Sequence, residues 1–491
     1  MPKPYVFLCF DTEDPIHPEA DDAVLDLARA LDSSGLRGCF FMVGEKARTL
    51  RARARRDVLE ALAPHEISYH GNHWFEFPEP ALVYGNRDPW DSAVATGLRY
   101  ELPGIRDVAE IAGQFPVAFC QHQNNYSVAT SHALECAGIK VWNGGFGAEM
   151  PGIAWVMGLL MVPRHSRSGG SLQGSWGRYR YDPDAPSAPP PMDPAAELRH
   201  FQVQFDAALE RGDTHVNLVG HPTCWAIADW WGWYEWGLPF QVSAHGTAPG
   251  PYPAGRRWER GTVRTGADRA AHLEWTVAAA RWLAARNDIR VATFDEVLRE
   301  HAEPAGIWLS AAQVQEVARV CAEGVRHLAV DGVSLSAADA LYVLAQFVAF
   351  LARERRRPAA VQVRRPLGPV EPIRTAPGSL GFLRPDLLLG ARLLVEYVDQ
   401  LGRLPAALRI HSLDCGPAEL LLALARALLT PTLPESITIE STAGLPESAA
   451  LPCFSHAAAA STHSPAGYTS DQIAWQARQQ SWSYRPAIRV S

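Results

Sequence analysis

Residues 5–14, YVFLCFDTED, begin the stretch that decides the fold. Its apolar run at residues 5–10 is typical of a buried strand. An amphipathic helical pattern follows at residues 23–34, and a second apolar run, CFFMVG, lies at residues 39–44. Strand, helix and strand in this order form one βαβ unit. The stretch therefore predicts a parallel sheet or barrel.

The same alternation of strands and helices continues to about residue 299. Further short apolar runs that favour strands lie at residues 66–69, 116–120, 140–142, 216–219 and 289–292. Two stretches rich in Pro and Gly, residues 181–194 and 246–264, interrupt the alternation. Proline can neither donate to a strand ladder nor sit inside a helix. We therefore expect both stretches to be long surface loops of one α/β domain.

Length and composition bound what the protein can be. The 491 residues correspond to about three domains at roughly 150 residues each. With 47% hydrophobic and 20% charged residues, disorder, collagen-like fibres and long coiled coils are excluded. The formal charge of −8 argues against a nucleic-acid partner, because neutralising phosphates needs an excess of basic residues.

Cysteine usage and the N-terminus favour a cytoplasmic protein. The 8 cysteines are scattered without CxxC pairs, so neither a disulfide framework nor a cysteine zinc site is predicted. The first apolar run is too short for a signal peptide. No stretch reaches the roughly 18 uninterrupted apolar residues of a membrane span. A cytoplasmic location with reduced thiols and no membrane span is the expectation.

Three carboxylates, Asp11, Glu13 and Asp14, come directly after the first predicted strand. The carboxyl ends of strands are where sites assemble in parallel α/β proteins. Three acids in four positions repel one another, and a bound cation or a retained proton relieves the repulsion. The alternative is an acidic cap on the helix that follows.

Histidines follow two other predicted strands. His70 and His73 lie in HEISYHGNHW at residues 65–74, and His221 lies in VNLVGHP at residues 216–222. A histidine pair spaced i, i+3 can direct both rings at one ion, and a carboxylate completes a three-ligand site that leaves one position open for water. Such an open site generates a hydrolytic nucleophile. Each histidine alone would be a loop or structural residue, but together they favour a metal site.

These motifs, taken in order, resemble those of the polysaccharide deacetylase superfamily, the nodulation-type deacetylase homology domain, over about residues 1–302. The matching segments are FD at 10–11, GLRGCFFMVGEKA at 35–47, HEISYHGNHW at 65–74, AGIKVW at 137–142, LVGHP at 218–222 and RVATFDEVLRE at 290–300. The resemblance implies a distorted (β/α) barrel and a divalent metal, commonly zinc. One carboxylate and two histidines would hold the metal.

The resemblance also implies roles for individual residues. Asp11 matches the general base, and His221 matches the general acid. Glu13 matches the metal carboxylate, with Asp14 as the competing assignment if the motif is shifted by one position. His70 matches the first histidine ligand.

Two departures from the family pattern bear on the site. The family's second histidine stands four positions after the first, where this chain has Trp74, and the nearest imidazole is His73. Either His73 still binds, or the metal site is weakened. The family arginine that orients the base should fall near residues 119–122, where this chain has no Arg. That group is therefore missing or replaced.

Tryptophans gather next to the last histidine motif: 5 of the 16 lie within residues 225–236. Flat aromatic faces suit stacking on a sugar ring or another planar substrate and exclude water from a site. Packing inside the domain is the alternative. The residues predicted to contact substrate are Trp74, Tyr126, Trp225, Trp230 and Trp231.

The chain after residue 302 changes to helices rich in Ala, Leu and Val, followed by a loose tail. A weak internal repeat suggests one helical unit at residues 303–374 and a second at residues 375–441. Residues 442–491 form the tail, with a short terminal helix. The units weakly resemble pseudomurein-binding-type repeats, with LGRLP at residues 401–405 as the best local match. This implies polysaccharide binding, and dimerisation or packing is the alternative.

The expected function is metal-dependent hydrolysis of an amide, an N-acetyl bond on an amino sugar or cell-wall polysaccharide. The expected partners are accordingly a carbohydrate or a small amide substrate. An amidase of the ureide- or allantoin-hydrolysing branch of the superfamily is the alternative enzyme. The non-enzyme alternative is a carbohydrate-binding protein on a deacetylase scaffold.

Overall fold

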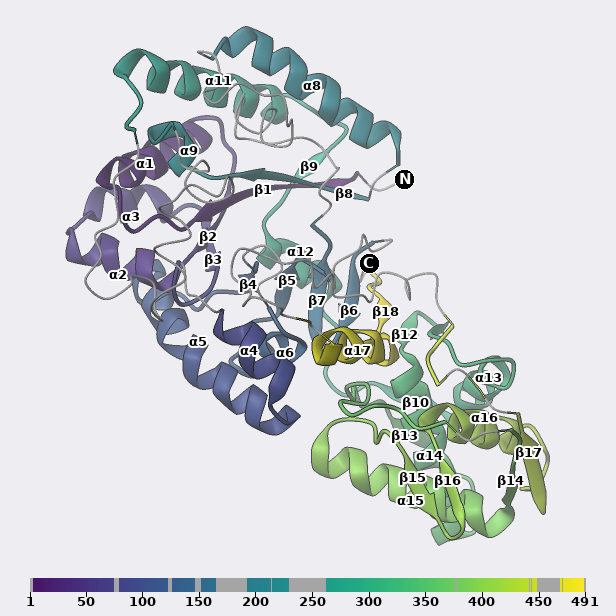
Figure 1. Cartoon of the computed structure of the whole chain (residues 1–491). Helices are drawn as coiled ribbons and strands as arrows, with labels where there is room; N and C mark the ends of the chain where they lie inside the picture. The colour runs from purple at the N-terminus through teal and green to yellow at the C-terminus, as the bar shows by residue number, and fades with distance from the viewer. Residues whose placement is uncertain are drawn as a thin grey trace.

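The computed structural model shows two packed parts, one built on a parallel sheet and one on paired helices (Figure 1). It describes residues 3–74, 79–121, 126–145, 152–164, 192–212, 214–228, 262–375, 378–440, 442, 444–447, 469 and 471–489. None of the helices within these ranges is long and apolar enough to cross a membrane.

The first part is a curled sheet with parallel strands at its centre. In spatial order the central strands are β7 (Leu159–Val162), β5 (Val141–Asn143), β4 (Ala118–Phe119), β3 (Glu66–Tyr69), β2 (Cys39–Met42), β1 (Tyr5–Thr12) and β8 (His215–Gly220). A short strand, β9 (Arg290–Val291), also pairs with β1 in parallel. At the β7 edge the sheet is extended by two antiparallel strands, β6 (Ala154–Val156) and β18 (Arg485–Pro486).

Strand β1 is buried along its whole length, as expected for a central strand of a parallel sheet. Because side chains alternate between faces, Val6, Leu8 and Phe10 join the core under the outer helices. Tyr5, Phe7 and Cys9 point to the opposite face and join a separate core inside the curled sheet. The strand therefore delivers every second residue to the interior.

The curled sheet is closed by side chains where the described strands do not pair. His215 Nε2 and Asn217 Nδ2, both on β8, lie 2.8 Å and 2.7 Å from the carbonyl oxygen of Pro163, which follows β7. These contacts join the two sides of the sheet across the remaining gap. The predicted fold class, a distorted (β/α) barrel, is confirmed.

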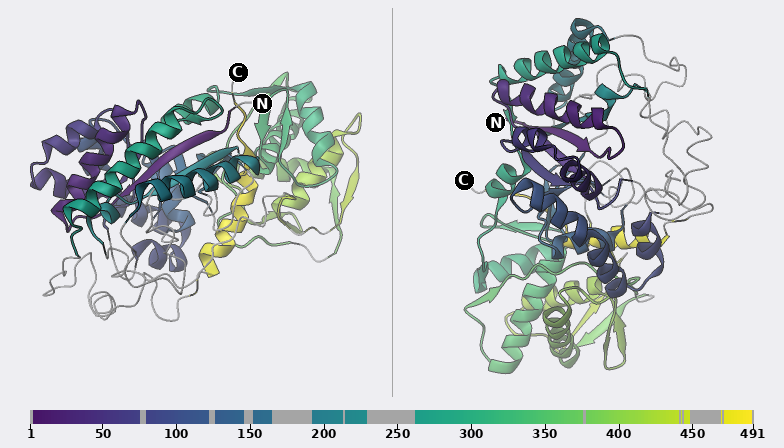
Figure 2. Two further views of the ribbon diagram at one scale, coloured as in Figure 1. Left: turned by 90° about the horizontal axis from the view of Figure 1, so that it is seen from above. Right: turned by 90° about the vertical axis from the view of Figure 1, so that its left-hand side faces the viewer.

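Helices cover the outer face of the barrel (Figure 2). They are α1 (Pro18–Ser33), α2 (Gly44–Ala52), α3 (Arg56–Leu62), α4 (Pro80–Arg87), α5 (Trp90–Ala112), α6 (Val128–Cys136), α8 (Pro194–Glu210), α9 (Thr223–Ala226) and α11 (Gly266–Ala284). Helix α12 (Phe294–His301) instead packs on the inner core, which Phe294 and Val297 join. Helix α12 begins after Thr293, which caps it in a capping box with Glu296. A Thr followed three residues later by Glu is the usual pattern of such a cap.

Helix α5 approaches the turn after β3 at Gly104. A Cβ added there would lie 2.7 Å from Cα of Asn72 and 2.8 Å from the Tyr69 hydroxyl. A side chain at this position would push the helix away from the turn. The close approach lets Tyr69 donate to Glu101 Oε2 at 2.5 Å, and so fixes the backbone around residue 70.

The second part contains the same order of elements twice. The first unit is β10 (Trp308–Ser310), α13 (Ala311–Cys321), β11 (Leu328–Val330), β12 (Val333–Leu335), α14 (Ala337–Glu354) and β13 (Ala360–Gln362). The second is β14 (Leu380–Leu383), α15 (Arg384–Leu401), β15 (Leu408–Ile410), β16 (Leu413–Cys415), α16 (Pro417–Leu428) and β17 (Ser436–Ile439).

Each unit is held by a hairpin between its helices and by pairing of its two outer strands. The hairpins are β11–β12 and β15–β16, and the outer pairs are β10–β13 and β14–β17, all antiparallel. The helices of both units share one hydrophobic core. The short strands were not predicted from the sequence. Polysaccharide binding by these units stays a prediction.

The end of the chain joins the two parts. Helix α17 (Asp471–Gln479) lies between them (Figures 1 and 2), and β18 pairs with β6 of the barrel. Gln480 Oε1 accepts from the Gly368 amide, and Gln479 Oε1 accepts from the Ile373 amide. Trp482 is buried in the core of the second part. The docked segment is thus a shared structural element rather than a loose end.

We expect Trp482→Ala to lower the free energy of unfolding by about 3–5 kcal/mol, as for other large buried aromatics. The Trp482 side chain is 0% exposed, and its Nε1 donates to the Gly444 carbonyl at 3.0 Å. Urea unfolding followed by circular dichroism measures the change. Trp308→Ala is the matched control, because Trp308 is 59% exposed. Equal losses in the two variants would contradict the prediction.

Candidate functional site

Two buried carboxylates, Asp11 and Glu13, lie at the end of β1. Asp11 is 4% exposed and Glu13 is 5% exposed. Asp11 continues the alternation that sends Cys9 to the interior of the barrel. Burying two ionised carboxylates is costly unless partners compensate for the lost water. The partners come from three other strands.

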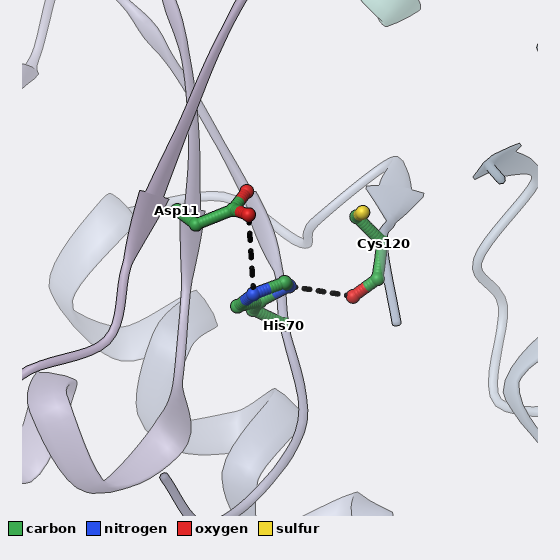
Figure 3. Close-up of side chains that lie close together, drawn as sticks. All are labelled: Asp11, His70 and Cys120. Atoms are coloured by element: carbon green, nitrogen blue, oxygen red, sulfur yellow. Dashed lines mark hydrogen bonds and ion pairs between the residues drawn. The ribbon is translucent and has the colours of Figure 1, made fainter. Parts of the chain in front are cut away.

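His70, the residue after β3, approaches Asp11 from one side (Figure 3), and its ring also faces Glu13. Its Nδ1 donates to the carbonyl oxygen of Cys120 at 2.6 Å. The Cys120 amide in turn donates to the Tyr69 carbonyl. With Nδ1 held in this way, His70 Nε2 lies 3.8 Å from Asp11 Oδ2 and 3.5 Å from Glu13 Oε2.

His221, the residue after β8, approaches from the other side of β1. Its Nε2 lies 3.3 Å from Asp11 Oδ2 and 3.7 Å from Glu13 Oε1. Strand β8 borders β1 directly, whereas β3 lies beyond β2 on the opposite side. Two imidazoles therefore approach the same two carboxylates from opposite sides of β1.

Arg164 pairs with Asp11 from beyond β7. Its Nη2 donates to Asp11 Oδ2 at 2.7 Å, and its Nη1 donates to Cys120 Sγ at 2.6 Å. The family resemblance places such an arginine near residues 119–122, where this chain has none, and Arg164 was not among the predicted site residues. The signal that could have found it is the apolar run LLMV at residues 159–162 followed by Pro-Arg. That strand was not predicted.

The charged neighbours decide the protonation of Asp11. Burial by itself raises the pKa of Asp11, but Arg164, His70 and His221 outweigh it and lower the pKa to about 2. Asp11 is therefore ionised at neutral pH. Burial lowers the pKa of His70, but the nearby Asp11 carboxylate and hydrogen bonding raise it well above its usual value.

Some of these donors lie close enough together to hold a small divalent cation. A tetrahedral zinc ion with bonds of about 2.0–2.1 Å holds neighbouring ligand atoms about 3.3–3.4 Å apart. The four distances between imidazole nitrogens and carboxylate oxygens run from 3.3 to 3.8 Å. Asp11 Oδ1 is buried without a hydrogen-bond partner in the described part of the chain. One ligand atom from each of Asp11, His70 and Cys120 lies within 4.8 Å of the other two, so these three residues form a group that could hold an ion.

Asp14 lies apart from this group of donors. Its Oδ2 pairs with Nδ1 of His17 at 2.8 Å, and its Oδ1 accepts from the Ile16 and His17 amides. These contacts fix the chain just before α1. The structure thus places Asp14 in the turn that precedes His17, the N-cap residue of α1.

His73 does not join His70 at the carboxylates. Its Nδ1 lies 3.9 Å from Glu45 Oε2, and its ring packs at a tilt against Tyr100 of α5. Burial, together with the Arg48 guanidinium, lowers the pKa of His73 to about 4. The i, i+3 spacing brings the two imidazoles to different sides of the turn, because Gly71 between them has a φ of 107°.

The described aromatic residues among those predicted to contact substrate are buried in the barrel core. Trp74 is fixed by its amide, which donates to Glu45 Oε2. The Tyr126 hydroxyl donates to the Gly145 carbonyl at 2.8 Å. A role of Trp74 and Tyr126 in substrate binding stays a prediction.

Trp225 lies on α9, close to the end of β8. It is 3% exposed and packs edge-on against Phe10. Its Nε1 has no acceptor among the described residues. Trp230 and Trp231 lie outside the described residues, so their predicted role as a substrate wall stays a prediction.

Comparisons with solved structures find similar chains. A family 4 carbohydrate esterase from Streptomyces lividans, in complex with acetate, is 13% identical and has a TM-score of 0.28; the match covers 59% of this chain and 92% of that one. The allantoinase PuuE is 12% identical with a TM-score of 0.37, covering 60% and 89%.

A CE4 family pseudoenzyme from Bacillus anthracis is also similar. It is 11% identical and has a TM-score of 0.26, with 45% of this chain and 55% of that chain covered. No protein-family model matches the sequence, and a search of curated proteins finds no match. The fold assignment therefore depends on the strand order of the chain itself.

Glu101 lies on α5, next to the turn that carries His70. The pH dependence of stability at Glu101 tests how this region is stabilised. Burial raises the pKa of Glu101 from 4.5 to about 7, although its hydrogen bond with Tyr69 opposes the shift. A carboxyl whose pKa is raised on folding destabilises the fold as pH rises from its unfolded pKa to its folded pKa. We expect Glu101→Gln to remove this loss of stability at higher pH.

The free energy of unfolding of the variant should equal that of the wild type near pH 4.5. It should exceed the wild-type value increasingly up to pH 7, by as much as about 3 kcal/mol. Urea unfolding at pH 5 and pH 8 measures the difference. Glu110→Gln is the control, because Glu110 lies on the same helix and its side chain is 64% exposed. A difference between Glu101→Gln and wild type that does not change with pH would contradict the prediction.

Proposed function

We propose that the chain is a metal-dependent hydrolase that cleaves a carbon–nitrogen amide bond, with Asp11 as its general base. The observation that carries this proposal is the state of the Asp11 carboxylate. Arg164 holds Oδ2, while the buried Oδ1 has no partner in the described part of the chain. An ionised oxygen without a partner, beside two imidazoles and a second carboxylate, suits the removal of a proton from water.

Glu13 and His70 would hold the divalent metal. Carboxylate and imidazole donors suit zinc. When bound, the metal would polarise the acyl oxygen of the substrate and lower the pKa of water toward about 7. Asp11 takes the proton of the attacking water on Oδ1, while Arg164 keeps the carboxylate in place through Oδ2. His221, whose Nε2 lies 3.3 Å from Asp11 Oδ2, would act as the general acid that protonates the leaving nitrogen.

The order of the sequence motifs favours an N-acetyl group on an amino sugar or cell-wall polysaccharide as the substrate. A cyclic ureide of the allantoin type is the second candidate, favoured by the absence of His73 from the donors. Both substrates undergo hydrolysis of an amide bond, so Asp11 has the same task in each. Acetate release from N-acetylglucosamine oligomers and ring opening of allantoin or hydantoin distinguish the two.

We expect Asp11→Asn to lower kcat by about 10²–10⁴-fold, the usual contribution of a general base, while the fold is retained. The comparison is Asp14→Asn, which tests the competing carboxylate. Asp14 lies against His17 and not among the donors, so its variant should keep most activity. Steady-state rates on the substrate selected above measure both. An active Asp11→Asn enzyme would exclude Asp11 as the base.

Arg164→Met should raise the pKa of Asp11, because the cation that opposes the effect of burial is removed. A base works when deprotonated, so the acid limb of the kcat/KM profile should move to higher pH. Arg164→Lys should restore part of the shift, since it keeps the charge but loses the second donor. A slower enzyme with an unmoved acid limb would show that Arg164 serves the fold alone.

A further inference from the structure

We infer that Cys120 is a positioning residue of the candidate site, which acts on the base Asp11 through the guanidinium of Arg164. Cys120 is the residue after β4, and it is 1% exposed. The inference rests on the proposed function, because Asp11 is the base of that reaction. It assigns a task to a thiol that the reaction itself does not consume.

The guanidinium of Arg164 joins Cys120 to Asp11. Its Nη1 donates to Cys120 Sγ at 2.6 Å, and its Nη2 donates to Asp11 Oδ2 at 2.7 Å. The N–H groups of a guanidinium lie in one plane with fixed directions. A single contact would leave this plane free to turn about the bond to Asp11, whereas two contacts define it. The thiol therefore fixes the direction from which Arg164 holds the base.

The Cys120 thiol is itself held in one orientation. Its Sγ donates to the carbonyl oxygen of Gln121 at 3.6 Å. A carbonyl oxygen only accepts hydrogen bonds, so the proton of the thiol points to Gln121 and the sulfur lone pairs face Arg164. The sulfur then accepts from Arg164 as a thiol and not as a second anion. The positive charge of the guanidinium remains available to Asp11.

The backbone of Cys120 is tied to the turn that carries His70. Its amide donates to the Tyr69 carbonyl at 3.0 Å, and its carbonyl accepts from His70 Nδ1 at 2.6 Å. These bonds continue the pairing of β4 with β3, in which Phe119 lies opposite Tyr69. Cys120 thus contacts the histidine side of the site through its backbone and the arginine side through its side chain.

The other end of Arg164 is held by the closure of the barrel. The carbonyl of Pro163, the preceding residue, is bonded by the side chains of His215 and Asn217 on β8. An arginine side chain has many rotamers, and fixing it at both ends selects one of them. The backbone supplies the first restraint, and the Cys120 thiol supplies the second.

The orientation of Asp11 follows from these contacts. Arg164 occupies Oδ2, and the buried Oδ1 has no hydrogen-bond partner in the described part of the chain. A guanidinium held in one plane keeps the carboxylate in one orientation, so Oδ1 meets the attacking water from a constant direction. A shift of about 1 Å at a reacting group can cost on the order of a hundredfold in rate. Removing the thiol should therefore slow the chemical step more than it weakens substrate binding.

The alternative role of Cys120 is that of a donor to an ion, since its Sγ lies near Asp11 and His70. The contact with Arg164 argues against this role, because an ion bound to Sγ would lie beside the guanidinium nitrogen that already donates to the same atom. Two positive charges so close together repel. The two roles predict opposite results when Cys120 is replaced, because a ligand variant loses the ion and a positioning variant keeps it.

A double-mutant cycle on the full chain tests the inference. Cys120→Ala removes the acceptor, Arg164→Met removes the cation, and the double variant removes both. Steady-state kcat and KM are measured on the amide substrate of the wild type, and circular dichroism confirms that each variant is folded. Cys120→Ser is the conservative variant, because a hydroxyl also accepts and donates. Cys39→Ala is the matched control, because Cys39 is 0% exposed and belongs to the same inner core.

We expect Cys120→Ala to lower kcat on the order of tenfold with little change in KM. Cys120→Ser should recover part of this loss, and Cys39→Ala should keep most of the wild-type kcat. In the Arg164→Met background, Cys120→Ala should lower kcat by no more than about twofold, because the group through which it acts is absent. Equal losses in the two backgrounds would show that Cys120 does not act through Arg164 and would overturn the inference.

Metal content and turnover of the same proteins separate this inference from the proposed function. Cys120→Ala should retain zinc after dialysis as the wild type does, and a loss of the ion in this variant alone would make Cys120 a ligand and overturn the inference. An unchanged kcat in Cys120→Ala, together with amide hydrolysis that is lost in Asp11→Asn, would overturn the positioning role and leave the proposed function intact. A wild type that hydrolyses no amide would overturn the proposed function, and the positioning role with it.

Discussion

The burial of two carboxylates at the end of β1 is the constraint on which the site depends. Asp11 and Glu13 are almost completely enclosed, and the cost of removing a carboxylate from water is several kcal/mol unless partners replace the lost solvation. The partners are Arg164, His70 and His221, each the first or second residue after a different strand. The carboxyl ends of four strands thus supply one electrostatic cluster.

Closure of the barrel brings the most distant of these partners into place. The Pro163 carbonyl receives the side chains of His215 and Asn217 from β8, so the chain leaving β7 is tied to the opposite side of the sheet. The next residue is Arg164, which consequently lies over the end of β1. A barrel closed by backbone pairing would not need these two polar side chains in its interior. The same contacts that close the fold therefore position the cation that holds Asp11.

The local part of this arrangement could be predicted from the sequence, and the non-local part could not. Hydrophobic periodicity located β1, β2, β3 and β8, and the residues directly after them include Asp11, His70 and His221. Arg164 was missed because its partner lies 153 positions away and its strand is short. The direction of His73 was not predictable either, because it depends on the backbone at Gly71 and on helix α5.

The three acidic residues at the end of β1 lie within four positions, yet each has different contacts and a different task. Asp11 still belongs to the strand, and alternation turns it inward to Arg164. Glu13 is two positions further, so it faces the same interior but reaches past Asp11 to both imidazoles. Asp14 falls on the other side of the chain and binds the amides that precede α1. Because Asp11 is paired with Arg164 while Glu13 faces both imidazoles, two buried carboxylates of similar chemistry receive different environments, which is the condition for one to act as a base and the other as a ligand.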